Sequence, residues 1–401
     1  MSELRIEEAR QLLLAHTVRI EEKERVSLWE AAGRVLAEPV TAQRNQPPFP
    51  RSPLDGYAVR STDIQGADPE HPARLSVIDE VAAGHVSKRR VEEHTAVRIM
   101  TGAPIPEGAD CVIRQEDTDY GEDTVQIYAE VKAWQNYCFE GEDYKKGTIL
   151  LEKGTILGAT EVGILASLGL QTAAVYRRAR AALLTTGDEI VLPGEELPEG
   201  KIYDSNLYTI GTRLRQWGTE LVCAERASDR AELVADKLRQ AAEHADILIT
   251  TGGVSVGKKD IMHEVLQILG CERLFWKVAV KPGMPTLCAV YRGKLLICLS
   301  GNPYGAAVNL ELLVRPVLAK MTGIKSLDLK RVQAAAQNGF PKKSGVTRYV
   351  RAFYEDGQVT MTDGSNASGI MSTMCGCNCL LEIPAGTQSV QKGDPVWAVL
   401  L

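Results

Sequence analysis

Apolar positions recur every three to four residues in two stretches near the N-terminus. These are IEEARQLLLAH (6–16) and LWEAAGRVLAEPV (28–40), and their spacing predicts that residues 1–45 are mostly helical. QRNQPPFPRSPLDGYAVR (43–60) is rich in proline and arginine, which predicts an extended loop. From about residue 57 to residue 144, short apolar runs alternate with Gly, Asp and Pro turns. This pattern indicates a compact β-rich domain.

Strand-like and helix-like runs alternate in the next part of the chain. The strand-like runs include ELVCAERA (220–227) and DILIT (246–250), and the helix-like runs include DRAELVADKLRQAAEHA (229–245) and IMHEVLQILG (261–270). Such alternation predicts a parallel sheet with helices on both faces, spanning about residues 179–325. The remaining residues, 330–401, show short strands and turns, which predicts a small β domain.

Length and charge restrict the class of protein. A chain of 401 residues is expected to form two to four domains. The 46 basic and 52 acidic residues give a net charge of −6, which makes nucleic acid an unfavourable general partner. A small anionic ligand is still compatible with this charge if a few Lys and Arg side chains converge locally.

The ends of the chain and its cysteines indicate a cytoplasmic protein. The N-terminus has acidic residues early and does not resemble a signal peptide, and no apolar stretch approaches the length of a membrane span. Nine cysteines, an odd number, suggest reduced thiols. Cys375, Cys377 and Cys379 would share one face if they lay on a strand. A metal site is one interpretation, but the one-residue spacing favours small apolar residues facing a core.

The loop TTGGVSVGKKD (250–260) matches parts of two catalytic motifs. It follows a predicted strand and precedes a helix, a position that favours anion binding. A nucleotide phosphate loop would need Ser or Thr where Lys259 stands. A hydrolase nucleophile at Ser255 would need a later histidine, and only His263, in the same predicted helix, follows it. We therefore expect Ser255 to contact a bound group rather than act as a nucleophile.

Carboxylates follow the predicted strands of the same sheet. They are Asp188, Glu189, Asp204, Asp229 and Asp260. Carboxylates gathered at one edge with little histidine suit Mg²⁺, which prefers oxygen ligands. For each acid alone the alternative is a helix N-cap.

Lysines and glycine-rich turns follow two further strand-like runs. In FWKVAVKPGMPT (275–286), a strand over 276–280 would place Lys277 and Lys281 on one face, where they could bind an oxyanion. In LICLSGNPYGAAVNLELLV (296–314), a strand leads through a glycine-rich turn into a helix near Ala306.

At this point the ordered motifs resemble those of molybdopterin molybdenumtransferases, the MoeA proteins and their gephyrin E-domain relatives. The motifs are PLDGYAVR, IMTGAPIPEGADCVIRQEDT, GEDYKKG, TTGDEI, GKIYDSN, TTGGVSVGKKD, WKVAVKPGMP and LSGNPYGAAV. They extend over essentially the whole chain. The resemblance implies a multi-domain α/β plus β protein: a helical linker domain (1–45 and 145–178), a β-rich second domain (46–144), a three-layer parallel-sheet molybdopterin-binding domain (179–325) and a small C-terminal β-barrel domain (330–401).

The resemblance also implies a function. Family members insert molybdate into adenylylated molybdopterin with Mg²⁺-dependent release of AMP, the last step of molybdenum cofactor synthesis, and they act as homodimers. A molybdopterin adenylyltransferase is then an expected partner. That adenylyltransferase activity is the alternative for this chain, because it resides on a domain resembling 179–325 alone. The additional domains and the LDGYAV motif argue against it, and a scaffold role usually accompanies an extra domain that this chain lacks.

The family's site residues carry over onto matching positions. Those expected to bind nucleotide and Mg²⁺ are Gly252, Gly253, Ser255, Gly257 and Asp260, with Glu189 and Asp229 near them. Those expected at the molybdate and phosphates are Lys277, Lys281, Pro282, Gly301, Asn302, Pro303, Arg348, Arg351, Ser368 and Ser372. Asp55, Thr101 and Asp143 match second-domain motifs that reach across the dimer.

Three departures from the family pattern affect anion contacts. Ser300 and Gly305 replace a proline and a serine in the usual P-G-N-P-V-S, and Met284 replaces a lysine in the usual K-P-G-K-P. The C-terminal glycine–serine motif appears only as NASGIM (366–371). These departures leave open a divergent paralogue that prefers another oxyanion, such as tungstate.

Overall fold

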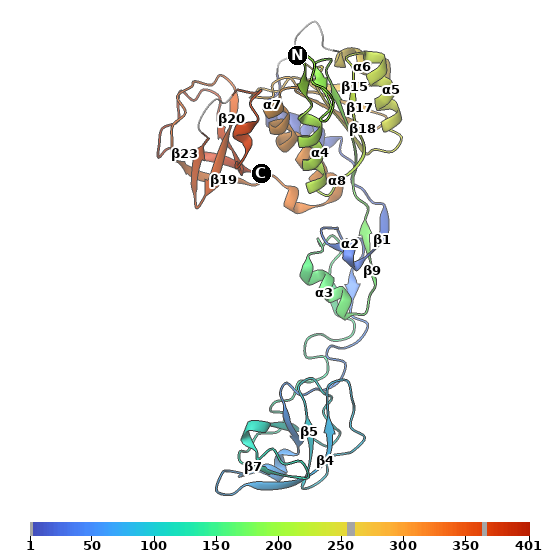
Figure 1. Cartoon of the computed structure of the whole chain (residues 1–401), viewed down its shortest axis with the longest axis vertical. Helices are drawn as coiled ribbons and strands as arrows, with labels where there is room; N and C mark the ends of the chain where they lie inside the picture. Colours follow the sequence, from blue (N-terminus) through green and yellow to red (C-terminus); the bar gives the residue numbers. More distant parts are fainter. Residues whose placement is uncertain (1–2, 255–260, 363–366) are drawn as a thin grey trace. The chain divides into compact units, whose positions relative to one another are not determined.

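A computed structural model describes residues 3–254, 261–362 and 367–401 of the chain. The chain forms two compact units, which we call the larger and the smaller unit (Figure 1). The larger unit comprises Met1–Ala37, Gly154–Gly158 and Thr172–Leu401. The smaller unit comprises Glu38–Lys153 and Ala159–Gln171. No helix among the described residues is long and apolar enough to cross a membrane.

A six-stranded sheet lies at the centre of the larger unit, with the order β13-β10-β14-β18-β17-β15. The first four strands are parallel and the last two are antiparallel additions at one edge. The strands are β10 (Arg180–Thr186), β13 (Glu220–Ala227), β14 (Ile247–Thr251), β15 (Glu272–Trp276), β17 (Leu287–Tyr291) and β18 (Lys294–Leu299). The predicted parallel sheet is thus present, and its central strands β14 and β18 are buried and mainly aliphatic because helices cover both faces.

Helices pack on the two faces of this sheet through alternating side chains. Leu183, Ile249 and Ile297 share a core with one group of helices, and Ala182, Leu248 and Leu296 share a core with the other. The first group is α1 (Ile6–Ala15), α4 (Asn206–Gln216), α7 (Pro303–Asn309), the π-helix η3 (Leu310–Val314) and α8 (Arg315–Thr322). The second group is α5 (Ala231–Ala241) and α6 (Met262–Leu269). Figure 1 shows this three-layer arrangement, as the resemblance implied.

The N-terminal region is less helical than its pattern predicted. Of the stretch 28–40, only α2 (Leu28–Ala31) is helical. It follows β1 (Lys23–Ser27), which pairs antiparallel with β9 (Thr172–Tyr176). Gly33, with φ of +75°, turns the chain away, and Val35 and Leu36 then form bridges to Ile156 and Val175. Pairing with residues distant in sequence overrides the local helical periodicity here.

The C-terminal residues form a closed barrel, as the resemblance implied. β22 (Cys379–Ile383) pairs with both β23 (Pro395–Leu400) and β20 (Thr347–Glu355), and this double pairing closes the barrel. β21 (Gln358–Met361) and β19 (Arg331–Ala336) complete the circuit. The short β16 (Val280–Lys281) adds to β20 from outside, so a segment of the α/β domain is hydrogen-bonded directly to the barrel.

The smaller unit is built around a five-stranded sheet with the order β6-β3-β5-β4-β7. Its strands are β3 (Gly56–Val59), β4 (Ala73–Val81), β5 (Thr95–Ile99), β6 (Cys111–Arg114) and β7 (Thr124–Ile127). Separate apolar clusters cover its two faces. The unit also contains the pair β2 (Val40–Thr41) and β8 (Ile149–Leu151), the helix α3 (Ala159–Ser167), and the 3-10 turns η1 (Ser61–Ile64) and η2 (Gln115–Asp117).

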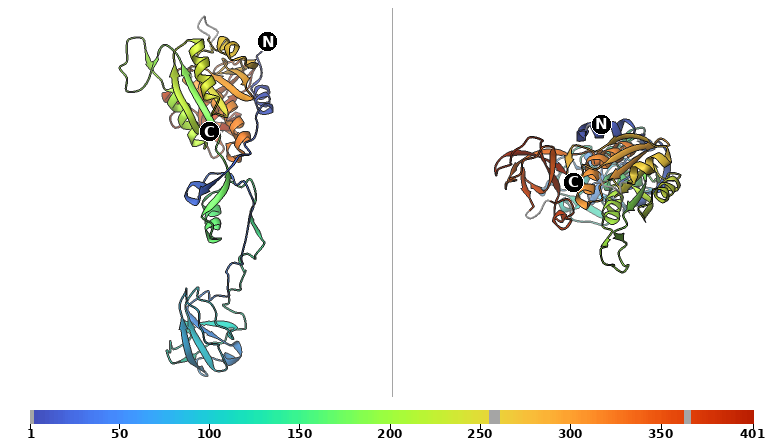
Figure 2. Two further views of the ribbon diagram at one scale, coloured as in Figure 1. Left: turned by 90° about the vertical axis from the view of Figure 1, so that its right-hand side faces the viewer. Right: turned by 90° about the horizontal axis from the view of Figure 1, so that it is seen from above.

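A projecting arm follows β10. Its base is the strand pair β11 (Ile190–Val191) and β12 (Ile202–Tyr203), and Figure 2 shows the connecting loop extending away from the rest of the larger unit. Ile202 is 59% exposed and Tyr203 is 44% exposed. The remaining short turns of the larger unit are η4 (Lys325–Leu327) and η5 (Ser372–Met374).

All nine cysteines are free thiols. Cys375, Cys377 and Cys379 do not share a strand face, because only Cys379 belongs to a strand, and the favoured interpretation of small residues facing a core holds for Cys379 alone. Cys379 lies in the barrel core, whereas Cys375 is exposed and the thiol of Cys377 donates to the Thr373 carbonyl. No group of three His, Cys, Asp or Glu side chains placed to hold a metal occurs within the described ranges.

Candidate functional site

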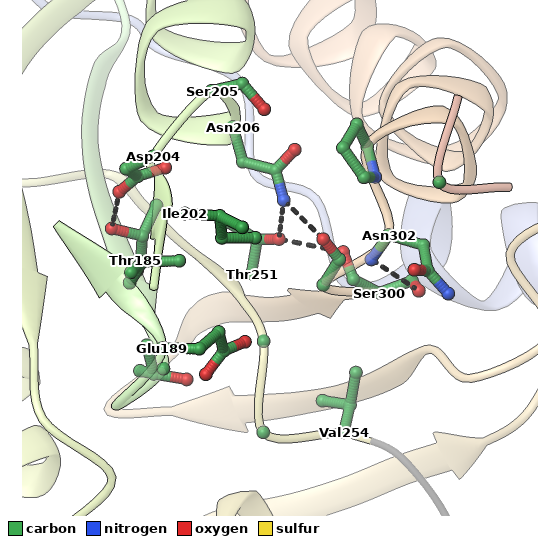
Figure 3. Close-up of a pocket in the computed structure, with 18 of the residues that line it drawn as sticks. Thr185, Glu189, Ile202, Asp204, Ser205, Asn206, Thr251, Val254, Ser300 and Asn302 are labelled. Carbon is green, nitrogen blue, oxygen red and sulfur yellow. Dashed lines mark hydrogen bonds between the residues drawn. The ribbon is translucent and has the colours of Figure 1, made fainter. Parts of the chain in front are cut away.

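A cavity of about 570 Å³ opens at the carboxyl ends of β10, β14 and β18 (Figure 3). We call it the acidic cavity, because Glu189, Asp204 and Asp229 line it. Its glycine-rich walls are Gly187, Gly252, Gly253 and Gly301. The sheet edge predicted to bind a ligand is therefore hollowed, as expected for an open α/β sheet.

Gly252 must be glycine for two physical reasons. Its φ of +96° lies in the left-handed region that side chains disfavour. A Cβ atom there would also lie only 2.1 Å from the Thr186 carbonyl oxygen. A Cβ on Gly301 would in turn lie 3.4 Å from the Gly252 Cα. The loops after three adjacent strands thus pack backbone against backbone, leaving room for a ligand above them.

A small polar network joins the loops of the acidic cavity. The Asn206 side-chain amide donates to the Thr251 hydroxyl at 2.9 Å and to the Gly301 carbonyl at 2.8 Å. The Thr251 hydroxyl donates to the Ser300 carbonyl at 2.8 Å. These bonds tie the start of α4 to the ends of β14 and β18 (Figure 3). Asn206 and Thr251 were not among the predicted site residues, although both lie within motifs that carry the resemblance.

The predicted carboxylates differ sharply in what they contact. Asp204 is buried, accepts from the Thr185 hydroxyl at 2.5 Å and caps α4 through the Leu207 amide at 3.0 Å. Asp229 and Asp188 exchange hydrogen bonds of 3.2 Å between each backbone amide and the other's carboxylate. Asp188 does not line the cavity. Helix capping and loop closure thus occupy three of the carboxylates.

Glu189 has the properties expected of a metal ligand. Its carboxylate points into the acidic cavity (Figure 3) and makes no hydrogen bond or ion pair with any other described residue. The buried hydroxyl of Thr186, beside it on the cavity wall, also lacks a hydrogen-bond partner within the described part. An uncommitted carboxylate oxygen fits a hard divalent cation such as Mg²⁺. Ser255, Gly257 and Asp260, also predicted at this site, lie outside the described residues.

A second cavity of about 580 Å³ adjoins the first. We call it the basic cavity, because its charged lining residues are Lys281, Lys342 and Arg348, and no acidic residue lines it within the described ranges. Pro285, Ser300 and Asn302 line both cavities. A single ligand with a phosphate in one cavity could therefore present its other end to an oxyanion in the next.

The turn after Lys281 is fixed by a buried asparagine. The Asn309 side-chain amide donates to the Gly283 carbonyl and to the Thr286 hydroxyl, both at 2.6 Å. Gly283 has φ of +96°, and a Cβ there would lie 2.7 Å from the Asn309 amide nitrogen. This packing holds Pro282 and Met284 in the lining of the basic cavity.

The predicted strand over 276–280 is absent, so Lys277 and Lys281 do not share a strand face. β15 ends at Trp276, and Lys277 adopts a positive φ of +71°. Its ammonium group lies 4.3 Å from the centre of the Trp276 ring and lines neither described cavity. The break arises because β15 belongs to the central sheet, whereas β16 pairs with the barrel.

The two predicted arginines occupy different environments. Arg348 lines the basic cavity, and its Nε atom is buried without a hydrogen-bond partner among the described residues. Arg351 is buried and lies against the Tyr304 ring, 3.6 Å from its centre. Burial lowers the pKa of the Arg351 guanidinium, although nearby Tyr304 opposes this. Arg351 donates to the Ala367 and Ile370 carbonyls and so holds the segment that carries Ser368.

Of the two serines predicted at the oxyanion site, Ser368 and Ser372, only Ser368 lines a cavity. Ser368 lines the basic cavity and its carbonyl accepts from the Tyr304 amide at 3.0 Å. Ser372 is exposed and lines neither cavity.

Packing accounts for the departures at Ser300 and Gly305. A Cβ on Gly305 would lie 3.2 Å from the Gly283 nitrogen and 3.4 Å from the Ser300 Cβ. The glycine therefore allows the turn after Lys281 to approach α7 closely. The Ser300 hydroxyl accepts from the Asn302 amide at 3.3 Å. Asn302 and Pro303, at the start of α7, both line the acidic cavity.

The smaller unit holds the other predicted residues. The Thr101 amide and hydroxyl both donate to the Asp55 carboxylate, each at 2.7 Å. These hydrogen bonds, the backbone one foremost, lower the pKa of the Asp55 carboxyl. Asp143 is exposed, and its amide donates to the Gln46 carbonyl at 2.9 Å.

Comparison with known proteins agrees with these observations. Family models match three consecutive parts of the chain: "MoeA N-terminal region (domain I and II)" at residues 4–169, "Probable molybdopterin binding domain" at 182–320, and "MoeA C-terminal region (domain IV)" at 333–401. A relative from Staphylococcus epidermidis named molybdopterin molybdenumtransferase is 35% identical over 378 residues, covering 94% of this chain and 90% of that protein. A Staphylococcus aureus relative of the same name has the same identity and coverage.

Solved structures show the same architecture. A crystal structure of a molybdopterin biosynthesis MoeA protein from Pyrococcus horikoshii OT3 superposes with a TM-score of 0.83 at 32% identity, covering all of both chains. A second MoeA structure from Pyrococcus horikoshii gives a TM-score of 0.85 at 28% identity, covering 100% of this chain and 99% of that one.

Proposed function

The chain belongs to the MoeA family and is a molybdopterin molybdenumtransferase of molybdenum cofactor biosynthesis, and we propose that it inserts molybdate into adenylylated molybdopterin with Mg²⁺-dependent release of AMP. In this reaction water cleaves the phosphoanhydride bond to AMP, and the two dithiolene sulfurs replace two oxygens of molybdate, which leave as water. The adjoining acidic and basic cavities are the observation that supports this proposal most directly.

The acidic cavity is the site proposed for the nucleotide phosphate. Gly252, Gly253 and Gly301 place no side chains in this part of the cavity, so that a phosphate can approach the backbone amides closely. Ser255, Gly257 and Asp260 follow Gly253 closely in the sequence and are proposed to contribute to the same site. Glu189, together with Asp260, would hold Mg²⁺, while Asp204 and Asp229 orient the surrounding loops. Bound Mg²⁺ would neutralise phosphate charge as the anhydride breaks.

The basic cavity is the site proposed for molybdate. Lys281 and Arg348 contribute positive charge, and Ser368 contributes a hydroxyl. Arg351 acts as a positioning residue by holding the segment of Ser368. Lys277 and Ser372 stay proposed contributors at the margin of the site. The exposed Asp143, with Asp55 and Thr101, is proposed to reach a partner subunit's cavity in a homodimer in the cytoplasm.

The test is a reconstitution with purified protein, adenylylated molybdopterin, Mg²⁺ and molybdate. We expect AMP release that requires both metal species, and formation of cofactor that activates a molybdenum-free molybdoenzyme. Tungstate in place of molybdate measures the oxyanion preference. Adenylylation of free molybdopterin with ATP, without insertion, would instead indicate the adenylyltransferase alternative. Absence of AMP release would overturn the proposal.

A further inference from the structure

The three cations of the basic cavity come from three separate segments that converge on one space. Lys281 and Arg348 are register partners in the parallel pair β16–β20, so their side chains leave neighbouring strands on the same side. Neither forms an ion pair with a described residue. Like charges at paired positions of a sheet repel each other. Lys281 is exposed and Arg348 is half-buried, so both positive charges are accessible to an anionic ligand that enters the cavity.

Lys342 adds a third cation from the barrel. It lines the same cavity and, like the other two, forms no ion pair within the described part of the chain. Its neighbour Lys343 does not line the cavity. Of these two neighbouring lysines, only Lys342 lines the basic cavity.

The backbone around Lys342 is held on both sides. Phe340 exchanges backbone hydrogen bonds with Val390, at 2.8 and 2.9 Å. Ser344, which is buried, donates its amide to the Thr387 carbonyl and accepts from the Gly386 amide. Phe340 also lies beneath Arg348, whose guanidinium carbon is 5.5 Å from the ring centre. Lys342 thus sits on a turn anchored to the barrel rather than on a free loop.

We propose that Lys342 is an oxyanion-binding residue that, with Lys281 and Arg348, makes the basic cavity selective for a tetrahedral dianion. Two cations can neutralise the charge of a dianion. A phosphate bound beside the dianion repels it, and a third cation in the cavity offsets this repulsion. Lys342 and Arg348 belong to the barrel domain, whereas the turn after Lys281 contributes the uncharged Met284 to the same lining. The inference rests on the proposed function for the identity of the dianion, molybdate.

Equilibrium binding of molybdate and tungstate to the full-length chain, measured by calorimetry without nucleotide substrate, tests the inference separately from turnover. We expect Lys342→Ala to weaken dianion binding by about 10-fold. Lys343→Ala is the matched control and should bind as the unaltered chain does. Adding a cation to the lining of the same cavity with Met284→Lys should recover binding in the Lys342→Ala background.

Steady-state AMP release adds a readout that a structural role would not change. Lys342→Ala should raise the KM for molybdate while the KM for adenylylated molybdopterin stays the same. Equal binding by Lys342→Ala and Lys343→Ala, or no dianion binding by the unaltered chain, would overturn the inference. Normal dianion binding without AMP release would instead overturn the proposed function and leave the role of Lys342 standing.

Discussion

At the scale of single residues, the acids of the acidic cavity perform different tasks. Asp204 is buried, and its two carboxylate oxygens accept hydrogen bonds from the Thr185 hydroxyl and from the Leu207 amide. Glu189 lines the same space, and its carboxylate makes no hydrogen bond or ion pair with a described residue. A carboxylate that stabilises a helix terminus cannot also offer a full lone-pair set to a cation. This difference supports the proposal that Glu189 binds the metal and that Asp204 positions the loop before α4.

Glu189→Gln should lower Mg²⁺-dependent AMP release by about 100-fold, because the amide loses the negative charge that attracts the cation. The fold should be unchanged, since the Glu189 carboxylate makes no hydrogen bond or ion pair with a described residue. Initial rates at a series of Mg²⁺ concentrations measure the effect. Glu196→Gln, an exposed position in the adjoining arm, is the control. A rate and Mg²⁺ dependence equal to those of this control would contradict the assignment.

The Asp55–Thr101 contact predicts a pH effect in the smaller unit. Thr101 lowers the pKa of the Asp55 carboxyl, so this contact stabilises the fold above the ordinary aspartate pKa of about 3.9. The contribution is lost as the pH falls through the lowered folded-state pKa. Thr101→Val removes the hydroxyl bond and should raise the Asp55 pKa, measured by NMR titration of its carboxyl carbon. Thr101→Ser keeps the hydroxyl and should leave the titration unchanged; equal titrations of the two variants would contradict this account.

At the scale of elements, the loops after β10, β14 and β18 act as one surface. Each loop follows a buried strand. The Gly252 backbone lies close to the Thr186 carbonyl and to Gly301, so that neither glycine has room for a larger side chain without displacing its neighbour. Because the strands are parallel, all three loops emerge at one edge. The site depends on the close approach of these backbones more than on any one side chain.

Gly252→Ala should destabilise the larger unit by at least about 2 kcal/mol, because it adds a backbone clash to the cost of a positive φ. Gly293→Ala is the matched control: Gly293 has φ of +77° with open space around it, so it should lose only about 1 kcal/mol. Urea unfolding monitored by circular dichroism gives both values. Similar losses for the two variants would show that the close approach to Thr186 is not limiting.

At the scale of the whole molecule, the predicted site residues are divided between two compact units. Asp55, Thr101 and Asp143 belong to the smaller unit, and Glu189 and Lys281 belong to the larger. In the homodimer that we propose, the smaller unit of one subunit would complete the cavity of its partner. If each site takes residues from both subunits of a two-fold dimer, variants in different units can restore each other's activity in mixed dimers.

Asp143→Ala and Glu189→Gln should complement each other when the two chains are co-expressed. With random pairing, half of the dimers carry both variants and each has one intact site, so AMP release should recover to about 25% of the unaltered level. Glu189→Gln with Lys281→Ala is the control, because both changes lie in the larger unit and leave no site intact. Recovery no greater than in this control would argue against shared sites.

Much of the architecture follows from local patterns in the sequence. The buried aliphatic strands and amphipathic helices of residues 179–325 specify a three-layer sheet, because period-two and period-3.6 patterns have few ways to bury their apolar faces. The strand-end position of Gly252, Gly253 and Glu189 follows from the same patterns. Motif order was enough to predict the family, which the comparisons confirmed.

Tertiary structure decided which of the chemically suitable residues face the cavities. Lys277 and Lys281 are close in sequence, but they belong to different sheets because β16 pairs with a strand more than sixty residues later. Arg348 and Arg351 differ by three positions, yet one lines the cavity and the other packs behind it on Tyr304. Lys342 lies in a stretch without any motif, and pairing of Phe340 and Ser344 with the barrel directs it to the site. Sequence periodicity determines what a strand buries; only long-range pairing determines which charges meet.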